Sequence, residues 1–163
     1  MQPTSEKRAG IHPLVLGARY GFLVVAWLFM LAVVAQFFLI GLSFFTTLGF
    51  EPHIELGHTF SLLIIVLFLL SLAARLPLKI VGLIALLFVL YGLQYVFAEV
   101  AQANPSSLGW LFAFHPVNAL IIFGLGTFLV RQARQFLPRP LGTLASAQPP
   151  AAQVPAGAEV AGD

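Results

Sequence analysis

The chain has 163 residues, of which 60% are hydrophobic and 9% are charged, with a formal net charge of +2. A soluble domain carries roughly a quarter charged residues, so this composition and the mean hydropathy of +0.97 predict an integral membrane protein. The absence of cysteine excludes disulfides, iron–sulfur clusters and haem attached through cysteine. The few cations stand at the ends of apolar runs, so we expect no nucleic-acid partner.

The N-terminal segment, residues 1–13, is polar and too short to fold alone. The apolar run that follows predicts a first transmembrane helix over roughly Leu14 to Phe45. Its apolar part is much longer than the roughly 7–15 residues of a signal-peptide core, and no small-x-small cleavage motif follows it. We therefore expect this helix to be retained and to span the membrane.

Three further apolar runs have about the length that a hydrocarbon core of roughly 30 Å requires. The second run covers about Leu56 to Ala74 and ends at Arg75, and the third covers about Leu78 to Val100. Residues 104–107, Asn-Pro-Ser-Ser, predict a loop. The fourth run begins near Trp110 or His115 and ends among arginines.

The C-terminal residues, 138–163, are rich in Pro, Ala, Gly and Gln and contain few bulky apolar side chains. Such a segment cannot bury enough surface to offset the entropy of ordering, so we predict a disordered tail. The predicted organisation is therefore an N-terminal segment (1–13), a four-helix transmembrane bundle (14–137) and a disordered tail (138–163). The fold class is all-α, an up-and-down four-helix bundle in the membrane.

The cations predict the orientation. They occur only in the N-terminal segment, at the start of the first helix, between the second and third helices, and after the fourth: Lys7, Arg8, Arg19, Arg75, Lys79, Arg131, Arg134 and Arg139. The other two loops contain no cation. By the positive-inside rule both termini are cytoplasmic and those two loops lie outside.

The outer half of the predicted bundle holds most of its polar side chains, which in membranes usually face the interior and mark function. These are Gln36, His58, Tyr91, Gln94, Tyr95, Glu99, His115 and Asn118. His58 and His115 each open an apolar run, on helices that run in the same direction and are diagonal in a square bundle. Two neutral imidazoles at one depth are a typical ligand pair for a b-type haem. We therefore expect both to be its axial ligands.

Other side chains are expected to assist this site. Glu55 lies one turn before His58 and is placed to orient an imidazole N–H or a water. Gln94, Tyr95 and Asn118 complete the predicted cofactor-binding set. His12 and His53 are expected to be loop residues without a ligand role. A short repeat also relates the two hairpins, because Leu48-Gly49-Phe50 and Leu108-Gly109-Trp110 each precede a histidine.

Glu55-x-x-His58, with a second histidine opening the fourth helix, resembles one four-helix half of haem A synthase. Thr59 stands where that family usually has arginine, and the chain has one four-helix unit rather than two, so the resemblance implies haem binding rather than haem hydroxylation. The span from His12 to Leu137, including the run His115-Pro-Val-Asn-Ala-Leu, is also similar to small uncharacterised bacterial four-helix membrane proteins. That similarity implies the cytoplasmic (inner) membrane of a bacterium.

Two alternatives to an electron-transferring haem protein remain open at this point. One is a divalent-metal site on the outer side, since imidazole and carboxylate suit zinc, iron or copper; its ligands would be Glu51, His53, Glu55, His58 and His115. The other is an accessory subunit without a cofactor, which stabilises a larger membrane complex. We assign no catalytic residue from the sequence. The expected partners are the lipid bilayer and a redox partner or larger complex.

Overall fold

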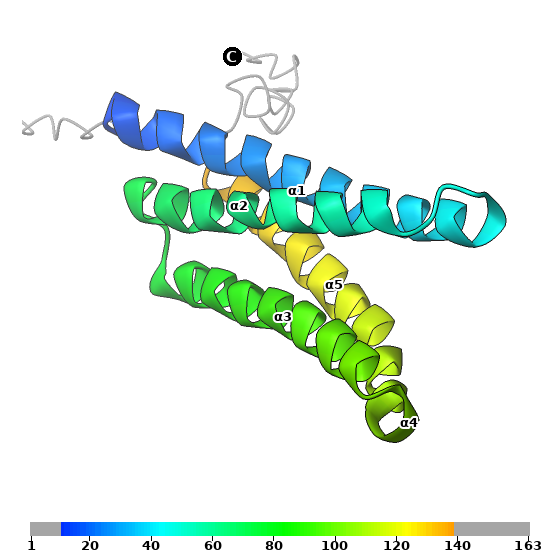
Figure 1. Ribbon diagram of the computed structural model, residues 1–163. Coiled ribbons are helices and arrows are strands. Elements are labelled where there is room, and N and C mark those ends of the chain that lie inside the picture. The colour runs from blue at the N-terminus through cyan, green and yellow to red at the C-terminus, as the bar shows by residue number, and fades with distance from the viewer. Residues whose placement is uncertain (1–10, 139–163) are drawn as a thin grey trace, which may run out of the picture.

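The computed structural model describes residues 11–138, and these form an all-α fold with four long apolar helices (Figure 1). The elements are α1 (Pro13–Phe45), α2 (Glu51–Ala73), α3 (Leu78–Ala103), α4 (Pro105–Leu108), the 3-10 helix η1 (Gly109–Ala113) and α5 (Phe114–Gln135). All four long helices are of a length and hydropathy that allow them to cross a membrane. The predicted fold class is therefore confirmed, and the protein is a multi-pass membrane protein. The predicted tail lies outside the described residues except for Pro138.

Several helix boundaries differ from the predicted ones. α2 begins at Glu51, five residues earlier than expected, so His53 lies in a helix and not in a loop. α3 continues to Ala103, and the predicted loop at residues 104–107 is largely the short helix α4. Proline explains both errors, because it is unfavourable inside a helix but well tolerated in its first turn. Pro52 and Pro105 each occupy a first turn.

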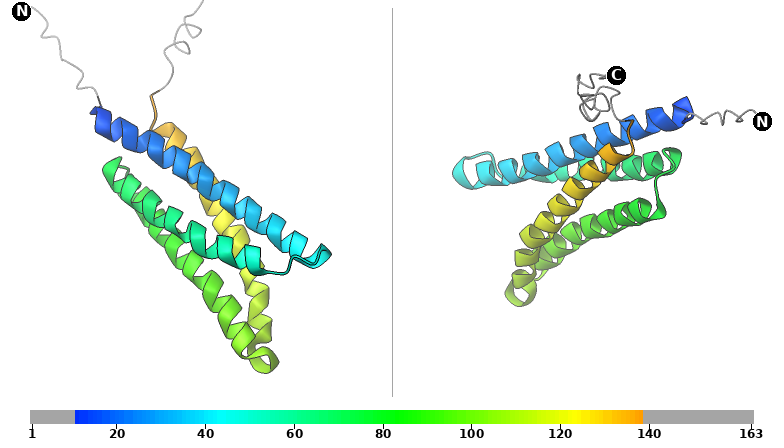
Figure 2. Two further views of the ribbon diagram at one scale, coloured as in Figure 1. Left: turned by 45° about the horizontal axis from the view of Figure 1, so that its top comes forward. Right: turned by 180° about the vertical axis from the view of Figure 1, so that it is seen from behind.

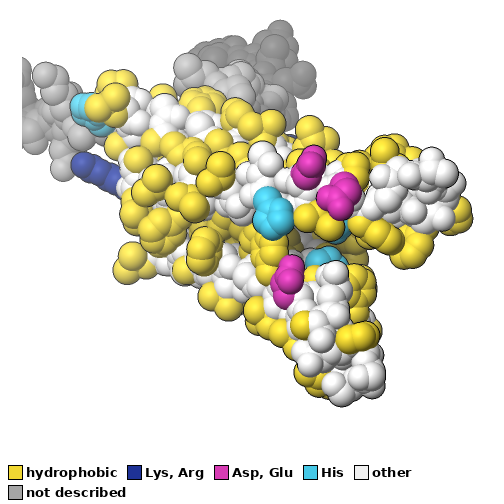
Figure 3. All heavy atoms as spheres, in the orientation of Figure 1, with side chains coloured by type: hydrophobic (Ala, Val, Ile, Leu, Met, Phe, Trp, Pro, Cys, Tyr) yellow, Lys and Arg dark blue, Asp and Glu magenta, His cyan; other side chains and the backbone are white. Residues whose placement is uncertain are grey.

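The helices are arranged as a ring in the order α1, α2, α3, α5, with α1 packed on α2 and α5 and with α3 packed on the same two helices. Within the described residues the backbones of α2 and α5 do not come close to each other, so these helices are diagonal, as the up-and-down topology predicts. We call the end that holds Glu51, Glu55 and Glu99 the acidic end. The opposite end, with Arg19, Arg75, Lys79, Arg131 and Arg134, is the basic end. Figure 3 shows this separation of charge.

At the basic end a sharp turn joins α2 to α3. The Leu76 N–H donates to the Ser71 carbonyl at 3.0 Å and the Arg75 N–H donates to the Leu72 carbonyl at 3.0 Å. This pair of bonds is a Schellman motif, which requires a left-handed residue after the helix. Arg75 takes that conformation, with φ 51°. The buried Leu76 then directs the chain into α3.

Arg19 ties three helices together at the same end. Its Nε donates to the Ala74 carbonyl at 3.3 Å and its Nη1 donates to the Phe136 carbonyl at 2.9 Å. Those two carbonyls belong to the C-caps of α2 and α5. A cation is favourable there because a helix C-terminus carries a partial negative charge. The side chain on α1 therefore holds the ends of both its neighbours.

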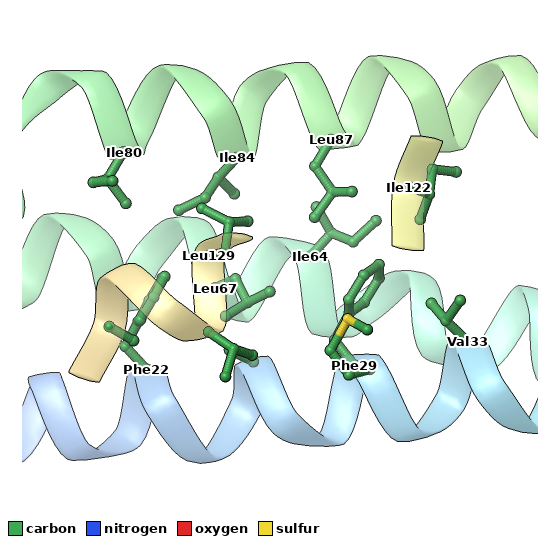
Figure 4. Packing of buried hydrophobic residues seen from close by; sticks show 14 of the residues in the cluster. Phe22, Phe29, Val33, Ile64, Leu67, Ile80, Ile84, Leu87, Ile122 and Leu129 are labelled. Atoms are coloured by element: carbon green, nitrogen blue, oxygen red, sulfur yellow. The ribbon is translucent and has the colours of Figure 1, made fainter. Parts of the chain in front are cut away.

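The hydrophobic core fills the middle of the bundle and its basic half (Figure 4). Phe22, Phe29, Ile64, Leu67, Ile84, Leu87 and Leu129 are almost completely buried, and they come from all four long helices. Toward the acidic end the hairpin α1–α2 separates from the hairpin α3–α5, so α2 and α3 diverge from their common turn (Figures 1 and 2). The bundle is closed at its basic end and opens into a wedge at its acidic end.

Candidate histidine site at the acidic end

His53 is positioned in the first turn of α2 by its bond to α1. The imidazole Nδ1 lies 3.2 Å from the backbone carbonyl of Gln36. A carbonyl oxygen only accepts hydrogen bonds, so Nδ1 carries the proton in this contact. In the neutral imidazole the lone pair on Nε2 is then available to a ligand. The ring is half-buried.

His115 is held in the same way in the other hairpin. It is the second residue of α5, and its Nδ1 lies 3.1 Å from the backbone carbonyl of Gln94 on α3. The ring of Phe112, from η1, stacks on it with an interplanar angle of 10° and ring centres 5.6 Å apart. The hydrogen bond to the carbonyl again places the proton on Nδ1 and leaves Nε2 free.

The two histidine rings face each other across the bundle. The ring centres of His53 and His115 are 6.2 Å apart, with an interplanar angle of 57°. The rings come from the diagonal helices α2 and α5, so this contact bridges the two hairpins where they part. Figure 3 shows histidine and acidic side chains gathered around this opening.

His58, the predicted partner of His115, has a different neighbour. Its exposed ring stacks on Tyr95 of α3, with ring centres 5.3 Å apart and an interplanar angle of 27°. The two rings line a groove of about 380 Å³ between α2 and α3, together with Ser61, Tyr91 and Gly92. The ring beside that of His115 is thus His53, one and a half helical turns before His58.

The polar side chains of α3 are divided between two sets of contacts. The Tyr91 hydroxyl donates to the Gly57 carbonyl of α2, and the Tyr95 hydroxyl lies 3.3 Å from the Tyr91 hydroxyl. The Asn118 amide, with only 4% of its surface exposed, donates to the Leu90 carbonyl at 2.7 Å and to Gln94 Oε1 at 2.8 Å. Tyr95 therefore belongs with His58, whereas Gln94 and Asn118 belong with His115.

Gln36 carries a second feature of the site besides its backbone bond to His53. Its side-chain Oε1 is buried and accepts no hydrogen bond from the described residues. A Cβ at Gly57 would lie 3.0 Å from Gln36 Nε2, so the amide is pressed against the backbone of α2. A buried acceptor without a donor is costly in a membrane protein. A bound group or water with an N–H or O–H would satisfy it.

The carboxylates do not join the histidines in a metal cluster. Glu51 and Glu55 are exposed, and Glu55 contributes a backbone carbonyl that accepts from Thr59 rather than a carboxylate contact to His58. Within residues 11–138 there is no group of three or more His, Cys, Asp or Glu side chains that could hold a metal ion. The five-residue divalent-metal site is therefore not assembled in this fold. His12 caps α1, with its Nδ1 3.3 Å from the Leu14 N–H.

Sequence reasoning named His53 only in the divalent-metal alternative, and it missed the backbone carbonyls that hold both rings. The internal repeat contains the signal that could have found them. Each hairpin contains a Leu-Gly-aromatic motif, which begins at Leu48 in the first and at Leu108 in the second. His53 lies five residues after Leu48 and His115 lies seven residues after Leu108, whereas His58 lies ten residues after Leu48. A glutamine carbonyl on the preceding helix accepts from each of the nearer histidines. The two hairpins therefore present matching Gln–His pairs.

Comparison with known proteins gives a partial similarity. Residues 36–102, from Gln36 on α1 to the end of α3, match a family model described as a family of unknown function (DUF6220). No curated protein and no solved structure matches the chain. The matched region includes His53, His58 and Gln94 but not His115. These comparisons show no similarity to haem A synthase or to a cytochrome.

Proposed function

We propose that the protein binds a b-type haem at the acidic end of the bundle, with His53 and His115 as the two axial ligands, for electron transfer. The observation that carries the proposal is the pair of imidazoles on diagonal helices, each with Nδ1 directed to a backbone carbonyl. Metal-binding histidines usually donate their second N–H in this way, which fixes the tautomer and the ring orientation. The proposal replaces His58 by His53 in the predicted ligand pair.

The spacing of the rings fits ligation of one metal ion. A metal–imidazole bond is roughly 2 Å long and a ring centre lies roughly 1 Å beyond its nitrogen, so two imidazoles that held one ion between them would have centres roughly 6 Å apart. The centres of His53 and His115 are 6.2 Å apart. The absence of a third ligand among the described residues favours a macrocycle over a bare divalent ion.

The other residues of the site have supporting tasks. A bound haem would supply reversible one-electron chemistry, with a potential set by its axial ligands and burial. Gln94 and Asn118 fix the α3 backbone whose carbonyl holds His115. Phe112 covers one face of the His115 ring and limits its rotation. Gln36 holds His53 and places an unsatisfied amide oxygen nearby.

We also propose that the acidic end faces the outside of a bacterial cytoplasmic membrane and that both termini are cytoplasmic. The basic end carries Arg19, Arg75, Lys79, Arg131 and Arg134, and the described carboxylates all lie at the other end. This asymmetry supports the positive-inside orientation. A reporter that is active only in the cytoplasm should be active when it is fused after Leu137. Activity there of a reporter that works only in the external compartment would contradict the orientation.

The haem proposal is tested by the absorption spectrum of the full chain, purified from a host supplied with haem. A Soret band and sharp α and β bands on reduction are expected. His53→Ala and His115→Ala should each abolish the low-spin spectrum, because each removes an axial ligand. His58→Ala and His12→Ala are the matched controls and should keep it, since neither ring lies beside His115.

Three outcomes would contradict the proposal. Loss of the spectrum in His58→Ala with retention in His53→Ala would restore the pairing of His58 with His115. Metal analysis that finds stoichiometric zinc, copper or iron without a Soret band would indicate a bare metal site. A chain that takes up neither haem nor metal under saturating supply would indicate an accessory subunit.

A further inference from the structure

The basic end carries a second feature that is unrelated to the histidines. A groove of about 490 Å³ runs between α1 and α5. Its α1 wall includes Trp27, Met30 and Val34, and its α5 wall includes Phe123, Arg131 and Arg134. Figure 2 shows these two helices crossing on the face opposite that of Figure 1. Trp27, Val34 and Phe123 in the groove lining are exposed, so the groove lies on the outer surface of the bundle.

The groove has one polar end and one apolar end. α1 and α5 are antiparallel, so Trp27 lies beside Arg134, while Val34 and Phe123 lie at the other end. The Arg134 guanidinium carbon is 5.3 Å from the centre of the Trp27 ring, a cation–π contact. The groove is therefore cationic toward the basic end and apolar toward the middle of the bundle.

Neither arginine has an acidic partner among residues 11–138. Arg131 and Arg134 are exposed, and the three carboxylates among the described residues, Glu51, Glu55 and Glu99, lie at the acidic end. Within the described part of the chain Arg134 contacts the Trp27 ring, and neither guanidinium forms an ion pair. Two cations without an acidic partner among the described residues, at the mouth of an apolar groove, are suited to an anion that carries a long apolar chain.

The length of the groove indicates what kind of apolar chain the anion carries. From Phe123 to Arg134 is eleven residues, or roughly 16 Å at 1.5 Å per residue. This is about half of a hydrocarbon core of roughly 30 Å, so the groove spans one leaflet. A second copy of this chain in the same orientation is a poor occupant. Its described carboxylates would lie at the acidic end, at a different membrane depth from Arg131 and Arg134. An acyl chain with its headgroup at the arginines fits both the charge and the length.

We propose that this groove binds an anionic phospholipid, with its phosphate at Arg131 and Arg134 and one acyl chain along Met30, Val34 and Phe123. Basic pockets between transmembrane helices are suited to such headgroups. The cation–π contact holds Arg134 over the indole, so its side chain needs little further ordering to meet a phosphate. The inference does not depend on haem binding.

Trp27 provides a direct probe of occupancy. The chain has two tryptophans, and Trp110 lies in η1 at the acidic end, so Trp110→Phe leaves Trp27 as the single emitter. The Trp110→Phe protein is reconstituted in vesicles that contain equal mole fractions of phosphatidylglycerol and phosphatidylcholine, with dibrominated acyl chains on one lipid or the other. Quenching of Trp27 then reports which lipid occupies the groove.

Brominated phosphatidylglycerol should quench more strongly than brominated phosphatidylcholine. Each arginine near a phosphate contributes roughly a fivefold preference. Arg131→Gln or Arg134→Gln should each lower the preference about fivefold, and the double variant should abolish it. Arg131→Lys with Arg134→Lys should retain it, because charge is kept. Lys79→Gln removes a cation at the same end but outside the groove, and it should change nothing.

Equal quenching by the two lipids in the protein with both arginines would overturn the proposal, as would an undiminished preference in the double glutamine variant. Loss of the preference on addition of millimolar inorganic phosphate would show that the arginines bind a free anion and not a lipid. A circular dichroism spectrum and a monodisperse elution profile for each variant separate loss of the site from loss of the fold.

Discussion

Arg19 offers the clearest test of how the bundle is closed, because one side chain on α1 reaches the ends of two other helices. Replacement by Met keeps an unbranched apolar stem but removes both hydrogen bonds, to Ala74 and Phe136. The two carbonyls then rely on water, and the last turns of α2 and α5 lose their shared anchor. We expect these turns to fray first.

The expected cost follows from the two bonds. A hydrogen bond to a charged group contributes about 1.5–3 kcal/mol to stability, and partial exposure reduces the electrostatic part. We therefore expect Arg19→Met to lower the free energy of unfolding by about 2–3 kcal/mol. At 1.4 kcal/mol per factor of ten, this is roughly a 30- to 140-fold change in the folding equilibrium. Arg19→Lys should recover only part of the loss. Lysine keeps the positive charge but lacks the forked donors that reach two acceptors.

The measurement is an SDS titration of the full chain in mixed micelles, followed by far-ultraviolet circular dichroism. Hydrogen exchange adds a local readout, with faster exchange expected in the last turns of α2 and α5. Lys79→Met is the matched control, because Lys79 is an exposed cation at the same end. A loss below about 0.5 kcal/mol for Arg19→Met, within the usual scatter of surface substitutions, would refute the argument. An equal loss in the control would also refute it.

Two further substitutions test the backbone and the helix packing. Arg75→Gly should raise the free energy of unfolding by about 1 kcal/mol, because Arg75 has φ 51° and a left-handed conformation is strained for a residue with a Cβ; a lower SDS midpoint would contradict this. Gly126→Leu should lower stability by about 1–3 kcal/mol through overpacking, because a Cβ there would lie 2.5 Å from Met30 Sδ. Gly124→Leu is its control, because a Cβ at Gly124 would meet nothing within 4 Å. Comparable losses in the two variants would show that the effect does not come from packing.

Much of the fold was determined by composition and hydrophobic patterning. Four apolar runs of spanning length leave few alternatives in lipid, because every backbone polar group must be satisfied within its own segment. Short connections between successive helices then favour the up-and-down ring and the diagonal relation of α2 and α5. The prediction that opposite charges gather at opposite ends also follows from the chain order alone. Each of these features depends on local sequence and connectivity.

The helix starts were less predictable, and this affected the site. The run of apolar residues marks where a helix enters the hydrocarbon, but α2 begins at Glu51, ahead of that run. Whether the segment with Pro52 and His53 continues a loop or opens a helix depends on how the connection from α1 closes. The placement of His53 as a loop residue was wrong for this reason.

Only the tertiary structure decided which histidine lies beside His115. His53 and His58 are both near the start of the same helix, but they are five residues apart, which at 100° per residue places them on different faces. The divergence of the hairpins and the rotation of α2 about its axis turn His53 toward α5 and His58 toward Tyr95. On α2 that rotation brings Gly57 close to Gln36 of α1 and buries Ile64 and Leu67 in the core. Sequence determined that each hairpin brings histidines to the acidic end, and packing between distant residues determined which of them meet.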